Sequence, residues 1–210
     1  MTLDELLQQP FVPLPDLIRR HARERPGHAA LVHEERRLDY AGLDALMDRI
    51  AATLQRDGLK PKDAIAICAA TSIEYAALFL GALRAGVAVA PLSPSSTADV
   101  IAGMARDSAA RRFFDESALT NLEGWLMPAG AKPAPVEIQP DWPFNIIYSS
   151  GTTGEPKGIV QPHVMRWRHV QRSVFTGYGP EAVTLLSTPL YSNTTLVSSF
   201  RPSRLAAPRC

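Results

Sequence analysis

The stretch NIIYSSGTTGEPKGIVQPH, residues 145–163, combines two β-prone segments with a loop of small and hydroxylated residues. Glycine tolerates positive φ and lets backbone N–H groups approach a ligand closely. The four serine and threonine side chains in residues 149–154 add further donors, and Lys157 adds a positive charge. Neutral donors around one cation suit a polyphosphate. The pattern therefore predicts a phosphate-binding loop, residues 148–158, between two strands.

Two well-known phosphate-binding patterns do not fit this loop. A Walker A loop places lysine between glycine and serine or threonine, whereas Lys157 follows Pro156 and precedes Gly158. The G-x-G-x-x-G pattern of dinucleotide-binding folds occurs nowhere in the chain. The simpler alternative is a plain hairpin turn, because turns are also rich in glycine and serine.

Residues 148–158, YSSGTTGEPKG, resemble the signature loop of the adenylate-forming enzymes, and so long a consecutive match argues against a plain turn. That superfamily comprises acyl-CoA synthetases, aryl-CoA ligases, luciferases and peptide-synthetase adenylation domains. Two further blocks extend the resemblance, RLDYAGLDAL at residues 37–46 and LRAGVAVAPLSP at residues 83–94. Both blocks are expected to form core scaffold and to carry no chemistry.

Strand and helix patterns alternate ahead of the loop. Ala64 to Ala70 is a continuous apolar run, short enough for a buried strand, and Thr71 with Glu74 predicts a capping box for a helix that runs to Arg84. A strand over 87–90, a helix over 97–107 and a strand over 112–114 follow. This order predicts an α/β fold with a doubly wound, mainly parallel sheet flanked by helices. The resemblance implies the N-terminal part of the large domain of an adenylate-forming enzyme, in truncated form.

The resemblance also implies a two-step reaction. A carboxylate attacks the α-phosphorus of ATP and displaces pyrophosphate, and a thiol then displaces AMP from the acyl-adenylate. The implied ligands are ATP, Mg²⁺ with Thr153 as a hydroxyl ligand, and CoA as co-substrate. A fatty or aryl carboxylic acid is the favoured substrate, and peptide-synthetase adenylation is less favoured because no carrier or condensation domain accompanies the loop. The implied phosphate ligands are Ser149, Ser150, Gly151, Thr152, Thr153, Gly154 and Lys157.

Residues 188–200, TPLYSNTTLVSSF, resemble the block where the family carries proline, an aromatic residue and histidine ahead of the acyl pocket. Tyr191 takes the aromatic position and is the candidate acyl-substrate residue, although it also fits an ordinary buried aromatic. Ser192 replaces the histidine. Residues 201–210, RPSRLAAPRC, depart from the family pattern and indicate a shifted reading frame, an engineered scar or a divergent tail. We therefore expect a partial adenylate-forming domain over 1–200 and an atypical tail over 201–210.

Other motifs of the family do not occur in these 210 residues. They are the acidic motif for metal and adenine, the ribose-binding aspartate, the hinge and the C-terminal lysine. The sequence therefore predicts no catalytic residue in this chain. It predicts the N-terminal fragment of an ATP-dependent acid–CoA ligase that is inactive alone. The alternative is a non-catalytic module that binds nucleotide or a partner.

Composition excludes several classes of function. The formal net charge of +1 gives no reason to expect nucleic acid as a partner, so the basic residues of the helix after Pro162 are expected to lie on a solvated face. These residues are Arg166, Arg168, His169 and Arg172. The two cysteines make no disulfide framework or metal site. No signal peptide and no apolar run of membrane-spanning length occur, so we expect a cytoplasmic protein without a membrane span.

Overall fold

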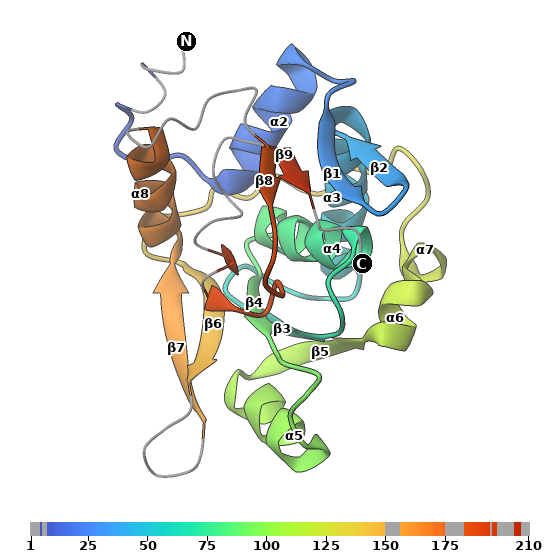
Figure 1. The fold of residues 1–210 in the computed structure, drawn as a ribbon, viewed down its shortest axis with the longest axis vertical. Coiled ribbons are helices and arrows are strands. Elements are labelled where there is room, and N and C mark those ends of the chain that lie inside the picture. The colour runs from blue at the N-terminus through green and yellow to red at the C-terminus, as the bar shows by residue number, and fades with distance from the viewer. Residues whose placement is uncertain are drawn as a thin grey trace.

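The computed structural model of the chain describes residue 5 and residues 8–149, 156–174, 183–193, 195–196 and 204–206. In chain order the elements are α2 (Leu14–Glu24), β1 (Ala29–His33), β2 (Arg36–Asp39), α3 (Tyr40–Arg56), β3 (Ala64–Cys68), α4 (Ile73–Arg84), β4 (Ala88–Pro91), α5 (Ala98–Asp107), β5 (Ala110–Asp115), α6 (Glu116–Thr120), α7 (Leu122–Trp125), β6 (Pro143–Ser149), β7 (Lys157–Pro162), α8 (His163–Val174), β8 (Val183–Leu185) and β9 (Arg204–Ala206). Figure 1 shows their arrangement, with α4 near the centre of the molecule. None of these helices is long and apolar enough to cross a membrane.

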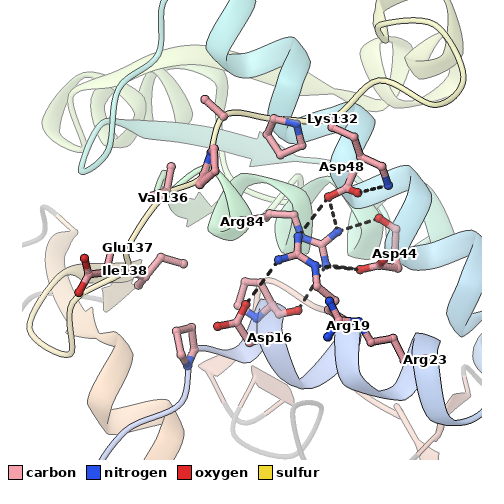
Figure 2. Close-up of a pocket in the computed structure, with 15 residues that line it drawn as sticks. Asp16, Arg19, Arg23, Asp44, Asp48, Arg84, Lys132, Val136, Glu137 and Ile138 are labelled. Atoms are coloured by element: carbon pink, nitrogen blue, oxygen red, sulfur yellow. Dashed lines mark hydrogen bonds and ion pairs between the residues drawn. The ribbon is translucent and has the colours of Figure 1, made fainter.

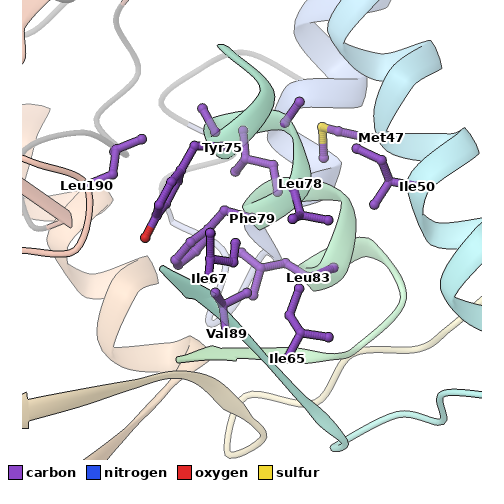
Figure 3. Close-up of a cluster of buried hydrophobic side chains, with 14 of the residues drawn as sticks. Met47, Ile50, Ile65, Ile67, Tyr75, Leu78, Phe79, Leu83, Val89 and Leu190 are labelled. Atoms are coloured by element: carbon purple, nitrogen blue, oxygen red, sulfur yellow. The ribbon is translucent and has the colours of Figure 1, made fainter. Parts of the chain in front are cut away.

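The central sheet confirms the predicted α/β fold. Its strand order is β5-β3-β4-β6-β7, and neighbouring strands are parallel except for the last pair, β6 and β7. Strand β3 is buried at every residue, as a strand covered on both faces requires. On one face, α4 contributes Leu78 and Phe79, which pack over Ile65 and Ile67 of β3 (Figure 3). On the other face, Met104 of α5 packs over the small residues of β3 and β4.

The predicted cap of α4 is wrong by one residue. Ser72, whose backbone is extended, precedes the helix, and its side chain accepts a hydrogen bond from the N–H of Tyr75 at 3.0 Å. A serine in this conformation holds its hydroxyl under the third helical N–H, so it satisfies that donor. Thr71 has another partner, because its Oγ1 accepts a hydrogen bond from the N–H of Leu190 at 3.1 Å. This contact anchors the segment after β8 to the start of α4.

The second sheet has the order β2-β1-β9-β8. In its edge strand β8, Val183 and Leu185 are 57% and 60% exposed. At a sheet edge, alternate residues face solvent, and Thr184 between them is buried. Three residues of the expected tail, Arg204–Ala206, form β9, which pairs in parallel with β1 and β8. The proposed boundary between residues 200 and 201 stays a prediction.

Candidate functional site

Strands β6 and β7 form an antiparallel hairpin at one edge of the central sheet (Figure 1). The register pairs Asn145 with Gln161 near its base and Ser149 with Lys157 at its end. Because β6 runs parallel to β4, Ser149 lies at the carboxyl edge of the sheet, where α/β proteins bind ligands. Ser149 and Lys157 are both exposed. The structure therefore brings the first and last predicted phosphate ligands opposite each other.

The other predicted phosphate ligands lie between these two residues in the chain and outside the described residues. They are Ser150, Gly151, Thr152, Thr153 and Gly154. Their roles, and that of Thr153 toward Mg²⁺, stay predictions. Within the described ranges, no three His, Cys, Asp or Glu side chains form a group that could hold a metal. We therefore assign no metal site.

Gly158 allows helix α5 to approach the hairpin. A Cβ at this position would lie 2.9 Å from Asp107 Oδ2, 3.1 Å from Ile146 Cγ2 and 3.2 Å from the hydroxyl of Tyr148. The same hydroxyl lies 2.7 Å from Asp107 Oδ2 and 2.8 Å from the carbonyl oxygen of Met104, and it donates to one of them at a time. Burial, followed by the hydrogen bond to Asp107 and its charge, raises the pKa of Tyr148. Tyr148 thus stays protonated and ties the hairpin to α5.

Helix α8 follows β7 directly and presents an unexpected residue to the interior. Arg166 is only 2% exposed, so the expectation that it lies on a solvated face is wrong. Residues 163, 167 and 170 are buried and recur at helical spacing, and position 166 falls on the same face. Arg168 and Arg172 are exposed, as predicted. The helical spacing of His163, Trp167 and Val170 is the sequence signal that could have identified the burial of Arg166.

The Arg166 guanidinium contacts amide oxygens from three segments. Its Nη2 lies 3.1 Å from Oδ1 of Asn145 and 3.1 Å from Oδ1 of Asn193, and it also donates to Oε1 of Gln161. Burial lowers the pKa of Arg166 to about 10, so the group is still charged at neutral pH. Among the residues that the structure describes, its Nε and Nη1 are buried without a hydrogen-bond partner. Sequence reasoning missed this cluster because its members come from separate elements.

The start of α8 does not offer an anion site. The backbone N–H of His163 donates to the carbonyl of Trp142 at 3.0 Å, and that of Val164 donates to the carbonyl of Pro140 at 2.8 Å. The His163 ring is 2% exposed and meets the ring of Phe144 edge-on at 5.1 Å between centroids. Burial lowers the pKa of His163 to about 4. His163 is therefore a neutral core residue at pH 7.

Tyr191 is half-buried and follows Leu190, which is 4% exposed. Figure 3 shows Leu190 beside Tyr75 of α4 in the main hydrophobic cluster. Asn193, two residues beyond Tyr191, is the residue that Arg166 contacts. The segment that carries the candidate acyl-substrate residue is thus linked to the base of the hairpin. The role of Tyr191 itself stays a prediction.

A separate open cleft of about 770 Å³ lies between α2, α3 and the proline-rich segment after α7 (Figure 2). Its buried centre is Arg84, whose Nη1 lies 2.8 Å from Asp48 Oδ1 and whose Nη2 lies 2.5 Å from Asp44 Oδ1. Lys132 reaches Asp48 Oδ2 at 2.6 Å. Burial acts to raise the pKa of Asp48, but Lys132 and Arg84 hold it below its usual value. These charges neutralise one another, so the cluster joins helices rather than forming a catalytic site.

Comparison with known proteins identifies the family. Residues 18–203 match the family model described as AMP-binding enzyme. The dimodular nonribosomal peptide synthase of Bacillus subtilis (strain 168) is 32% identical over 176 residues, which cover 73% of this chain and 7% of that protein. Tyrocidine synthase 3 of Brevibacillus parabrevis is 30% identical over 198 residues, which cover 85% of this chain and 3% of that protein. The chain thus spans less than a tenth of the length of these curated relatives.

Among solved structures, VinN in complex with 3-methylaspartate matches with a TM-score of 0.81 at 21% identity, over 93% of this chain and 62% of that chain. The curated relatives are named as peptide and tyrocidine synthases, so the preference for a CoA ligase over a peptide-synthetase adenylation domain is not supported. The signature loop could not decide between these branches, because it resembles that of the whole superfamily. The chain belongs to the AMP-binding enzyme family.

Proposed function

We propose that this chain binds ATP through the β6–β7 loop as part of a domain that activates an amino or aryl acid as its adenylate. The observation that carries the proposal is the hairpin register, which sets Ser149 opposite Lys157 at the carboxyl edge of the sheet. In this proposal the loop N–H groups and hydroxyls of residues 150–154 bind the β- and γ-phosphates. Lys157 neutralises part of their charge.

The chemistry of adenylation explains why such a loop is needed. A carboxylate oxygen forms a bond to the α-phosphorus, and the bond from that phosphorus to the bridging oxygen breaks, so pyrophosphate leaves with the electron pair. Negative charge therefore grows on the β-phosphate side as the reaction proceeds. Donors fixed beforehand, together with Lys157, stabilise that charge more than they stabilise bound ATP. The β6–β7 pairing and the Tyr148–Asp107 hydrogen bond hold the two ends of the loop in place for this task.

Similarity to peptide synthases favours an amino acid or aryl acid over a fatty acid as the substrate. The same similarity favours a thiol on a carrier domain, rather than CoA, as the group that receives the activated acid. A non-catalytic binding module is less favoured, because the chain keeps the signature loop intact. The sequence contains none of the family's other catalytic motifs, so we still expect the purified 210-residue chain alone not to form adenylate.

Calorimetry with non-hydrolysable adenylates tests this proposal without requiring turnover. Aminoacyl, aroyl and long-chain acyl sulfamoyl-adenosines are titrated into the purified chain, and ATP is used as a competitor. The proposal predicts that an aminoacyl or aroyl compound binds most tightly and that ATP displaces it. Tightest binding of the long-chain acyl compound would instead favour a fatty acid as the substrate. Binding that ATP does not displace would contradict the proposed site.

A further inference from the structure

Arg166 joins the two strands of the hairpin to a third segment. Its Nη2 lies 3.1 Å from Asn145 Oδ1 on β6 and 3.1 Å from Asn193 Oδ1 in the segment after β8. The same nitrogen also donates to Gln161 Oε1 on β7. Because Nη2 carries two protons, it bonds at most two of these acceptors at once, and all three oxygens crowd around one positive charge. One side chain thus lies within hydrogen-bonding distance of both strands and of the segment that contains Tyr191.

Core stability alone does not account for an arginine at this position. Arg166 is 2% exposed, and no ion pair with a carboxylate is formed by Arg166 within the described parts of the chain. Its guanidinium lies 5.6 Å from the centre of the Phe144 ring, a cation–π contact that offsets part of the cost of burial. Replacing a whole buried ion pair by apolar side chains is often neutral or stabilising, so a buried charge is weak evidence of a stabilising role. Such departures from ordinary core composition concentrate at functional sites.

The contacts of Arg166 lie at the base of the hairpin, on both of its strands. Asn145 pairs with Gln161, four residues along each strand from the pair formed by Ser149 and Lys157. At about 3.3 Å per residue, this distance is roughly 13 Å. A rotation at the base of the hairpin is therefore amplified at its end. Fixing both strands at the base holds the residues that flank the loop.

The segment on the other side of Arg166 is anchored independently. The N–H of Leu190 donates to Oγ1 of Thr71 at 3.1 Å, and the N–H of Ser192 donates to the carbonyl of Pro189 at 2.9 Å. Asn193 follows these anchored residues directly. Its contact with Arg166 connects a segment held by α4 to a hairpin held by α5.

We propose that Arg166 is a positioning residue that couples the ATP-binding hairpin to the segment carrying Tyr191. This inference rests on the proposed function. Attack on the α-phosphorus requires the acid and the nucleotide to be held in a fixed relative geometry. A buried cation that contacts both segments supplies such a fixed relation, because moving either segment would remove at least one of the acceptors around its charge.

Hydrogen exchange of the purified chain, with and without saturating Mg·ATP, tests the coupling. In the wild type, ATP slows exchange of the hairpin amides and slows that of residues 190–193 by about fivefold or more. Arg166→Met keeps the slowing of the hairpin amides and loses that of residues 190–193, although its melting temperature falls because Asn145 and Gln161 lose a buried donor. Arg166→Lys keeps the charge without the planar fork and retains part of the coupling. Arg168→Met replaces an exposed arginine of the same helix and behaves as the wild type.

Several results would overturn the inference. ATP-dependent slowing at residues 190–193 that persists in Arg166→Met removes the coupling role. Slowing that is lost in both segments of Arg166→Met assigns Arg166 a purely structural role. Slowing confined to the hairpin in the wild type leaves ATP binding intact and refutes only the coupling. If ATP slows the exchange of no amide in the wild type, both the proposed ATP binding and the proposed coupling are refuted.

Discussion

The buried His163 predicts a specific loss of stability in mild acid. Its pKa is lowered from 6.5 to about 4 by burial, so between these values the unfolded chain binds a proton that the folded chain does not. The unfolding free energy therefore falls as the pH drops from 7 towards 4, and above pH 7 the group contributes almost no pH dependence. The two pKa values give a loss of about 2 kcal/mol at pH 5 from this residue alone. His163→Phe keeps an aromatic ring against Phe144 and removes the proton-binding group.

Urea unfolding followed by tryptophan fluorescence measures the effect. The unfolding free energy is determined at pH 7 and pH 5 for each protein, and only the difference between the two pH values is compared, so a change in absolute stability cancels. His163→Phe should lose about 2 kcal/mol less than the wild type between these pH values. His21 lies on α2, and burial also lowers its pKa to about 4. His21→Phe should therefore reduce the pH dependence as well, and the effects of the two substitutions should add. The same pH dependence in His163→Phe and the wild type would refute the reasoning.

Three further substitutions test other contacts. Gly158→Ala places a methyl group 2.9 Å from Asp107 Oδ2 and should lower the unfolding free energy by about 1–3 kcal/mol. Adding Asp107→Ala should recover part of this loss. An unchanged unfolding free energy would show that α5 shifts to make room for the methyl group without cost. Asp48→Ala removes a carboxylate from the buried Arg84 and should lower the unfolding free energy in urea by about 3 kcal/mol, so an unchanged midpoint would contradict the described network. Val160 is 58% exposed on an edge strand, so Val160→Lys should increase the monomer fraction in size-exclusion chromatography. The unfolding free energy should change by less than about 0.5 kcal/mol. A large loss of stability would show that this edge is covered.

The sequence was sufficient for the central sheet because its pattern is local. The run from Ala64 to Cys68 is apolar at every position, and a strand of that length must be covered on both faces. Helix α4 ends at Arg84, as predicted, and Gly86 just beyond it has a φ of +71°, a conformation that favours glycine at such a helix end. The choice between Thr71 and Ser72 as the cap could not be made from sequence. It depends on the backbone of the segment that connects β3 to the helix.

The surroundings of the candidate site could be predicted only in part. Ser149 and Lys157 face each other because a loop between two β-prone segments closes a hairpin. The burial of Arg166 depends on amide oxygens from Asn145 and Asn193, which lie 21 and 27 residues away in the chain. The helical spacing of the buried His163, Trp167 and Val170 indicates that position 166 faces inward, but no local pattern reveals these acceptors. The branch of the family also could not be read from the loop, because the loop resembles that of every branch of the superfamily.

Titration of the purified chain with pyrophosphate and with Mg·ATP by calorimetry tests the central claim most directly. Lys157→Ala removes the cation at the end of the hairpin, and Lys60→Ala removes an exposed lysine in the turn before β3 as a matched control. The account predicts that Lys157→Ala weakens both ligands about tenfold or more, the effect of losing a charged hydrogen bond, while Lys60→Ala leaves both affinities unchanged. Equal affinities in the wild type and Lys157→Ala would contradict the claim that this hairpin binds the phosphates of ATP.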